Sequence, residues 1–280
     1  MAKVEALTWG YGLLEGPRVD DDGNLYFSDV PNGGVYRLAS SGEVTTAVPK
    51  RRGVGGIALH ADGGLVVGGR NICHVKDGET RVIHTPDSGI NDLFVDAAGH
   101  ILYGTLRTDP FAEGGLTGAR RPGECWRIES AGSATQIYGD IGLSNGIGLS
   151  PDGSVVYHSD TTANAVWAHD YDPAGAATNR RPHVQREDLL PDGLAVDEAG
   201  NVWVADFGGS GAAIGFGPDG REVARIEVPA REVTSLCFGG ADRRDLYIVT
   251  ADNTEDSSRG GTVFHTRADV PGCAVARATV

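Results

Sequence analysis

Cysteine is scarce in this chain, with only four in 280 residues: Cys73, Cys125, Cys237 and Cys273. No two of them have the spacing of a thiolate zinc site. We therefore expect buried, unpaired thiols in a reducing compartment. The opening segment MAKVEALTWGYG lacks the apolar core of a signal peptide. No run of about 18 apolar residues is present to span a membrane. These absences predict a cytoplasmic protein.

Positive charge is also scarce, because 24 lysines and arginines face 38 aspartates and glutamates, a formal net charge of −14. Such a chain repels phosphate backbones and anionic membrane surfaces, which excludes nucleic acid and membranes as partners. G-x-S-x-G, P-loop and H-E-x-x-H motifs are missing, so nothing supports a serine hydrolase or a nucleotide enzyme. No segment has the apolar period of a helix, which argues against an α/β fold.

Glycine is abundant, at 42 residues, and it accompanies a repeated phrase. Each copy has a polar start, a short apolar strand, an Asp/Gly turn and a second strand. Successive copies begin 36 to 54 residues apart, at positions 15, 55, 91, 145, 192 and 234. This period predicts an all-β fold: a single six-bladed β-propeller over residues 1–280, with four antiparallel strands per blade. A seven-bladed ring is the alternative.

Further segments complete the predicted blades. Apolar stretches at 33–40, 164–172 and 212–220 are expected to form the outer strands. Segments 3–9 and 261–268 both have the character of strands, and pairing them within one blade would close the ring. The longest step contains an extended Gly/Pro/Arg loop over 107–125, inside the third blade.

Equivalent repeat positions lie on a circle around a propeller axis. The first residues of the six copies are Glu15, Gly55, Asn91, Asn145, Asp192 and Thr234. Asn145-Gly146 and Asp192-Gly193 are also typical of turns, and Asn91 of a loop. However, each copy already contains a turn, and turn chemistry does not predict a ring. Converging carboxylate and amide oxygens without Cys or His favour a hard cation, with Ca²⁺ best and Mn²⁺, Mg²⁺, Zn²⁺ or Fe²⁺ as alternatives.

Other polar residues have a structural interpretation. Asp29, Asp160 and Asp206 end strands in three copies, so we expect them to brace loops through backbone N–H groups. Asp197 falls at a turn and is expected to be solvated. His158 lies in an apolar strand and is expected to be a hydrogen-bonded core residue.

Four segments together resemble the gluconolactonase, senescence marker protein and luciferin-regenerating enzyme family of six-bladed propeller lactonases. They are LLEGPRVDDDGNLYFSDV, GINDLFVDAAGHILYGTL, LSNGIGLSPDGSVVYHSDTTANAVWAHDYD and LPDGLAVDEAGNVWVADF. The resemblance implies a divalent metal held by Glu15, Asn145 and Asp192, with Asn91 contacting the substrate. It implies hydrolysis of a small lactone by metal-activated water, for which we expect Asp192 to act as general base.

One position departs from that family. Sugar-lactone members often carry an arginine two residues before the asparagine that matches Asn91, and here that residue is Gly89. Either the substrate is less polar than an aldonolactone, or Arg107, Arg120 or Arg121 replaces the missing guanidinium. A phosphotriester or aryl-ester hydrolase with the same metal site is an alternative, as is a non-catalytic binding scaffold.

Overall fold

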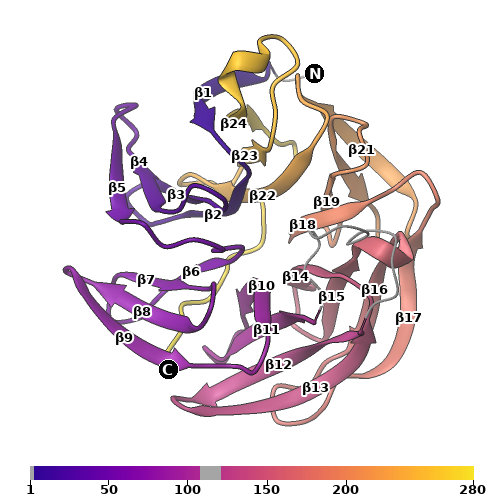
Figure 1. Cartoon of the computed structure of the whole chain (residues 1–280). Helices are drawn as coiled ribbons and strands as arrows, with labels where there is room; N and C mark the ends of the chain where they lie inside the picture. The colour runs from indigo at the N-terminus through magenta and orange to yellow at the C-terminus, as the bar shows by residue number, and fades with distance from the viewer. Residues whose placement is uncertain (1–2, 108–120) are drawn as a thin grey trace.

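The computed structural model describes residues 3–107 and 121–280. They form six four-stranded antiparallel sheets arranged as blades around a central channel, which confirms the predicted six-bladed all-β propeller (Figure 1). Blades 1 to 3 each use four consecutive strands. Blade 1 contains β2 (Leu14–Val19), β3 (Leu25–Asp29), β4 (Val35–Leu38) and β5 (Val44–Val48), and blade 2 contains β6 (Ile57–Leu59), β7 (Leu65–Val67), β8 (Ile72–Lys76) and β9 (Glu79–His84). Blade 3 contains β10 (Gly89–Val95), β11 (Ile101–Leu106), β12 (Gly123–Ser130) and β13 (Ser133–Ile141).

Blades 4 and 5 follow the same order, and blade 6 joins the two ends of the chain. Blade 4 contains β14 (Ser144–Leu149), β15 (Val155–Asp160), β16 (Ala165–Asp170) and β17 (Thr178–Gln185), and blade 5 contains β18 (Pro191–Val196), β19 (Val202–Asp206), β20 (Ala212–Phe216) and β21 (Glu222–Glu227). Blade 6 contains β22 (Val233–Gly239), β23 (Asp245–Thr250), β24 (Gly261–Arg267) and β1 (Glu5–Tyr11). β1 pairs with β24, so the predicted ring closure is confirmed.

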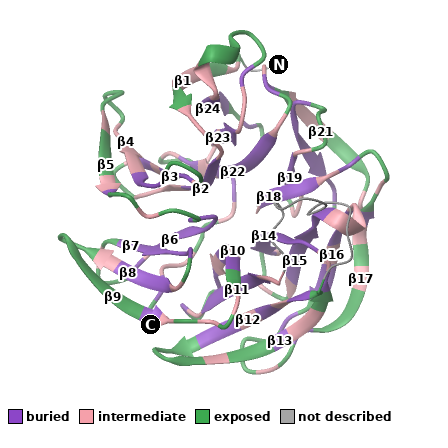
Figure 2. Ribbon diagram, in the orientation of Figure 1, coloured by how far each residue is buried: buried purple, intermediate pink, exposed green. Residues whose placement is uncertain are grey.

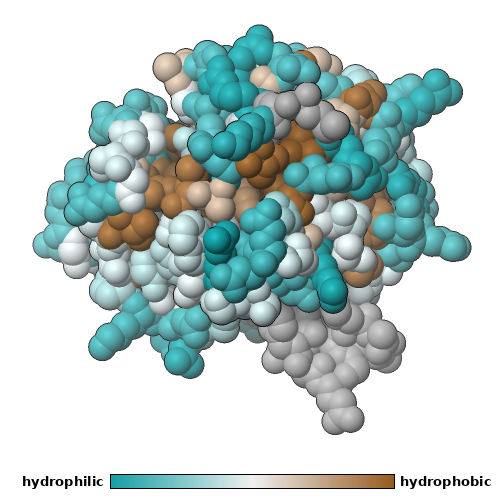
Figure 3. Space-filling view, turned by 90° about the horizontal axis from the view of Figure 1, so that it is seen from above, coloured by the Kyte–Doolittle hydropathy of each residue, from teal (hydrophilic) through white to brown (hydrophobic). Residues whose placement is uncertain are grey.

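Each copy of the repeated phrase supplies the two innermost strands of a blade. These strands are largely buried, whereas the outermost strands are exposed along much of their length (Figure 2). The segments at 33–40, 164–172 and 212–220 contain β4, β16 and β20. These are third strands rather than the outermost ones, because a further strand pairs outside each. From the edge of the ring the surface is mostly hydrophilic, with a hydrophobic band between the polar groups (Figure 3).

Helices contribute little to the described ranges. They hold only two short 3-10 helices, Thr161–Ala163 and Ser257–Arg259. Neither has the length and apolar character to cross a membrane. All four cysteines are unpaired as expected, although Cys273 is only partly buried. Most of the predicted 107–125 loop, residues 108–120, lies outside the described ranges, and its last residues already belong to β12.

The aspartates that end strands brace loops as predicted. Asp29 accepts a hydrogen bond from the Gly12 amide (3.0 Å), and Asp206 accepts one from the Leu190 amide (3.0 Å). Asp160 binds the amides of Gly142 and Leu143 in the same way, at 2.8 and 3.1 Å. In each case a carboxylate satisfies backbone donors of the segment that leads into an inner strand.

The prediction for Asp197 is wrong, because this residue is fully buried rather than solvated. Its carboxylate accepts hydrogen bonds from the Ala199 and Asn201 amides, both at 3.0 Å, and from the Trp203 indole at 2.9 Å. Residue Gly272, far away in sequence, forms a β-bridge with it and covers the turn. Asp197 therefore organises a hairpin turn from inside the protein.

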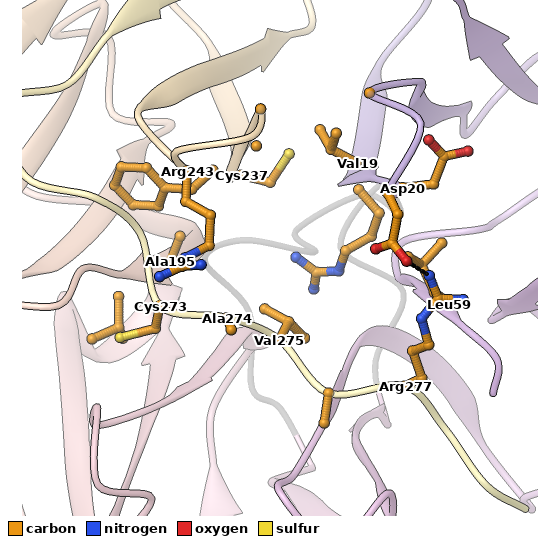
Figure 4. Close-up of a pocket in the computed structure, with 18 of the residues that line it drawn as sticks. Val19, Asp20, Leu59, Ala195, Cys237, Arg243, Cys273, Ala274, Val275 and Arg277 are labelled. Atoms are coloured by element: carbon orange, nitrogen blue, oxygen red, sulfur yellow. Dashed lines mark hydrogen bonds and ion pairs between the residues drawn. The ribbon is translucent and has the colours of Figure 1, made fainter.

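Segment 271–280 crosses the mouth of the channel opposite the starts of the inner strands. The Cys273 amide donates to Val196 O of blade 5 (2.9 Å), and the Ala278 amide donates to Leu59 O of blade 2 (2.9 Å). A cavity of about 520 Å³ lies beside this segment. Figure 4 shows Cys273, Ala274, Val275 and Arg277 along the crossing segment, with Val19, Leu59 and Cys237 around it.

Candidate functional site

The predicted site residues lie in irregular stretches of four innermost strands. In each of these strands the pairing register shifts, as in a β-bulge, at the start of the repeated phrase. Bulges re-aim side chains and are frequent next to active sites. The four stretches carry Glu15, Asn91, Asn145 and Asp192.

These four residues line one cavity of about 540 Å³ at the mouth where the inner strands begin. Gly55, a fifth member of the predicted ring, lines it as well. The sixth, Thr234, is not among the lining residues. It is fully buried, and its hydroxyl donates to Leu14 O (2.5 Å) and Val249 O (3.0 Å). Thr234 therefore ties blades 6 and 1 together instead of facing the cavity.

Glycines allow the inner strands to approach closely enough for this convergence. A Cβ at Gly55 would lie 2.6 Å from Asn91 Oδ1, and one at Gly146 would lie 2.7 Å from Asp192 O. Both distances are shorter than real Cβ contacts. A side chain at either position would force neighbouring blades apart.

A chain of hydrogen bonds fixes the Asn145 amide. The Thr161 hydroxyl donates to Pro191 O (2.7 Å) and accepts from Asn145 Nδ2 (2.9 Å). On the other side, Asn91 Nδ2 donates to Asn145 Oδ1 (2.7 Å) and to Ser144 O (2.8 Å). Because the amide nitrogen of Asn145 faces Thr161, its oxygen faces Asn91, and that oxygen keeps a second lone pair.

Two buried carboxyl groups, those of Glu15 and Asp192, line the cavity, and the buried carboxyl group of Asp92 lies near enough for its charge to act on both. Burial raises the pKa of Glu15 well above its usual range, and the charges of Asp192 and Asp92 raise it further, opposed by the Gly16 amide. Burial, followed by the charge of Asp92, also raises the pKa of Asp192, opposed by the Gly193 amide. Like charges in a low-dielectric site favour protonation unless a cation neutralises them.

Asp92 is a residue that sequence reasoning missed. It is buried, and burial raises its pKa to about 6 although the Arg18 guanidinium and the Leu93 and Ile147 amides oppose the shift. Its carboxylate accepts from Leu93 N (2.7 Å) and Ile147 N (3.3 Å). A signal for it was present: the other five copies have glycine or serine at this repeat position.

The residues fit a hard divalent cation. Asp192 Oδ1 is buried and has no hydrogen-bond partner among the described residues. An unsatisfied buried carboxylate oxygen is costly unless a ligand completes it. The described ranges contain no cluster of three or more His, Cys, Asp or Glu side chains with metal-binding geometry. The expected ligand set has only two such groups, Glu15 and Asp192, because the third ligand, Asn145, is an amide.

Two of the three arginines considered as replacements at Gly89 are described. Arg107 lines the cavity, whereas Arg121 is not among its lining residues, and Arg120 lies outside the described ranges. Arg107 is already paired, with Glu124 (3.1 Å) and Asp87 (2.9 Å). A Cβ at Gly89 would lie 3.3 Å from Leu106 Cβ, so a longer side chain there would need that neighbour to move.

The other sequence-based assignments near the cavity are structural. His158 is fully buried, with its ring nitrogens 2.8 Å from the Tyr138 hydroxyl and 2.8 Å from the Ser144 hydroxyl. Burial lowers its pKa to about 3. The predicted core role of His158 is therefore confirmed. Thr161, which sequence reasoning did not single out, lines the cavity and orients Asn145.

The fold and the cavity define the class: a six-bladed β-propeller with an acidic, oxygen-lined site at one mouth of its channel. A family model described as "SMP-30/Gluconolactonase/LRE-like region" matches residues 13–252. The chain belongs to this family, and the resemblance inferred from the repeated segments is confirmed.

Relatives and a solved structure agree with this membership. Pentonolactonase XacC of Haloferax volcanii is 30% identical over 86% of this chain and 81% of its own length. A 6-deoxy-6-sulfogluconolactonase of Pseudomonas putida is 33% identical, with 89% of each chain covered. The structure of a luciferin-regenerating enzyme matches with a TM-score of 0.88 at 25% identity, over 100% of both chains.

Proposed function

We propose that this protein is a metal-dependent hydrolase that opens a small lactone, a carboxylic ester hydrolase like its relatives named as lactonases. The observation that carries the proposal is the buried, unpartnered Asp192 Oδ1 in the cavity that Glu15, Asn91 and Asn145 also line. A binding scaffold has no need of such a group, and its cost is explained if it binds a ligand.

Glu15, Asn145 and Asp192 would hold one divalent cation. Oxygen ligands favour Ca²⁺, with Zn²⁺, Mn²⁺, Mg²⁺ and Fe²⁺ as alternatives. When bound, the cation supplies positive charge that polarises the ester carbonyl and lowers the pKa of a water. Glu15 contributes negative charge, and the hydrogen bond from Asn145 to Thr161 holds the amide oxygen in a fixed direction.

The protein side chains then have distinct roles. Asn91 orients the lactone. Asp192 accepts a proton from the water while the water oxygen forms a bond to the carbonyl carbon. The bond between that carbon and the ring oxygen then breaks. The proton passes to the ring oxygen, which becomes the hydroxyl of the hydroxy-acid product. The lactone itself is the small-molecule partner.

The proposal is tested with the Asp192→Asn variant. We expect kcat/KM for the best lactone to fall by about 100-fold or more, and calcium affinity measured by calorimetry to fall as well. Asp219→Asn, at an exposed position in blade 5, is the matched control and should match the wild type. Treatment with EDTA should abolish turnover, and added Ca²⁺ should restore it.

The substrate panel should contain sugar lactones, aliphatic lactones, an aryl ester and a phosphotriester, followed with a pH indicator. Unchanged hydrolysis of every lactone by metal-free protein would contradict metal dependence. Full lactonase activity in Asp192→Asn would contradict the assignment of the base. Turnover of only the phosphotriester or aryl ester would replace the lactone as substrate.

A further inference from the structure

The wall of the candidate active-site cavity is largely apolar. Above the oxygen-lined floor it is formed mainly by Leu13, Val30, Ile90, Leu106, Leu143 and Phe207, together with glycines. A volume of about 540 Å³ accommodates a small molecule. Outside the ring positions, three described lining residues have side chains that can hydrogen-bond: Arg70, Arg107 and Thr161.

Two of these three are already engaged. The Thr161 hydroxyl donates to Pro191 O and accepts from the Asn145 amide, as described above. Arg107 is neutralised by two carboxylates, with its Nε 3.1 Å from Glu124 and its Nη1 2.9 Å from Asp87. Thr161 is uncharged and the charge of Arg107 is neutralised, so neither residue offers a ligand an unpaired charge.

Arg70 differs from them. It is exposed at the cavity rim, on the turn between β7 and β8, and makes no hydrogen bond or ion pair with any described residue. The turn itself is held firmly: Arg51 donates from Nε to Gly68 O (2.8 Å) and from Nη2 to Asn71 O (2.6 Å). Because Arg51 fixes both sides of the turn, Arg70 is displayed at a defined place on the rim.

We propose that the substrate is a lactone whose apolar body ends in an anionic group, such as a carboxylate, that pairs with Arg70. This inference rests on the proposed lactonase function and names the substrate class. A polyhydroxylated lactone would turn hydroxyls toward apolar walls, where they would lose their hydrogen bonds to water. An apolar body avoids that loss, and an anionic end gives the guanidinium a charge-assisted partner.

The test compares three γ-lactones: one with an alkyl chain, one with a carboxylate at the end of a chain of equal length, and one that is polyhydroxylated. We expect kcat/KM to fall in the order carboxyalkyl, alkyl, polyhydroxylated. In Arg70→Gln, we expect kcat/KM for the carboxyalkyl lactone to fall about tenfold, to near the alkyl value, with the alkyl lactone unchanged. Raising the salt concentration should erode the same preference in the wild type.

Arg221→Gln is the matched control, since it removes the same charge from an exposed position in blade 5. It should leave the order and the ratio unchanged. If Arg70→Gln lowered kcat/KM equally for the alkyl and the carboxyalkyl lactone, or for neither, the pairing with Arg70 would be overturned. Fastest turnover of the polyhydroxylated lactone would overturn the apolar body. Failure of the wild type to hydrolyse any lactone would instead refute the proposed function itself.

Discussion

Replacing Gly146 with alanine tests whether the spacing between blades 4 and 5 sets the geometry of the site. Gly146 follows Asn145 in β14 and faces the backbone of β18, which carries Asp192. A Cβ at Gly146 would overlap Leu194 N and would lie 2.7 Å from Asp192 O. Backbone atoms cannot swing aside as a flexible side chain can, so the two strands must separate.

The size of the effect follows from these contacts. Ordinary contact begins near 3.4 Å, so the contact with Asp192 O alone requires the strand of Asp192 to move by about 0.7 Å relative to Asn145, and the closer overlap with Leu194 N requires more. Metal sites tolerate ligand displacements of about 0.2 Å. We therefore expect a loss of about 10- to 100-fold in metal affinity and up to about 100-fold in kcat/KM. The free energy of unfolding should fall by about 1–3 kcal/mol from overpacking.

Calorimetric titration with Ca²⁺, lactone kinetics and thermal unfolding measure the three quantities. Gly148→Ala is the matched control, because its Cβ would meet only the side chains of Leu194 and Val196, which can rotate away. Metal affinity and turnover should be nearly unaffected in that variant. If Gly146→Ala behaved like the wild type, or if both variants lost function equally, spacing of the two strands would not control the site.

Two further predictions concern the surroundings of the site. Thr161→Val removes the hydroxyl that holds the Asn145 amide, so Ca²⁺ affinity by calorimetry should fall about tenfold or more, whereas Thr161→Ser should retain it. His158 is buried neutral with its pKa lowered to about 3, so the unfolded chain binds its proton first as the pH falls. Between about pH 6.5 and pH 3, His158 should therefore lower the free energy of unfolding by up to about 1.4 kcal/mol for each unit by which the pH falls. The effect should be complete near pH 3 and absent above about pH 6.5. Urea unfolding at several pH values should show a shallower acid loss in His158→Gln; parallel curves would contradict this account.

The repeat register was enough to predict the blades and the convergence of the site. Period and symmetry are properties of the chain, and a closed ring turns equal repeat positions into neighbours in space. Glu15, Asn145 and Asp192 could therefore be placed in one cavity although they are far apart in sequence. Thr234 shares the register but not the environment, because its hydroxyl is used between blades.

Other features depend on contacts that no repeat encodes. The turn of Asp197 has the composition of a solvated loop, but Gly272 forms a bridge with it and Cys273 Sγ donates to its carbonyl oxygen. Burial of that carboxylate is therefore decided by a segment about 75 residues later. Arg70 could not be predicted from the repeat either, since its lack of a partner among the described residues appears only once the rim of the cavity is folded.

The segment that crosses the far mouth of the channel also bears on the route by which small molecules reach the active-site cavity. Residues 273–278 lie over that opening, and backbone hydrogen bonds join them to blade 5 at one end and to blade 2 at the other. Arg18, hydrogen-bonded to Ile57 O (2.9 Å), lines the cavity beneath it. For the proposed reaction, we expect the lactone and its hydroxy acid to use the same opposite mouth, so that each product molecule leaves before the next substrate enters. Accumulated product should accordingly compete with substrate for the same entrance.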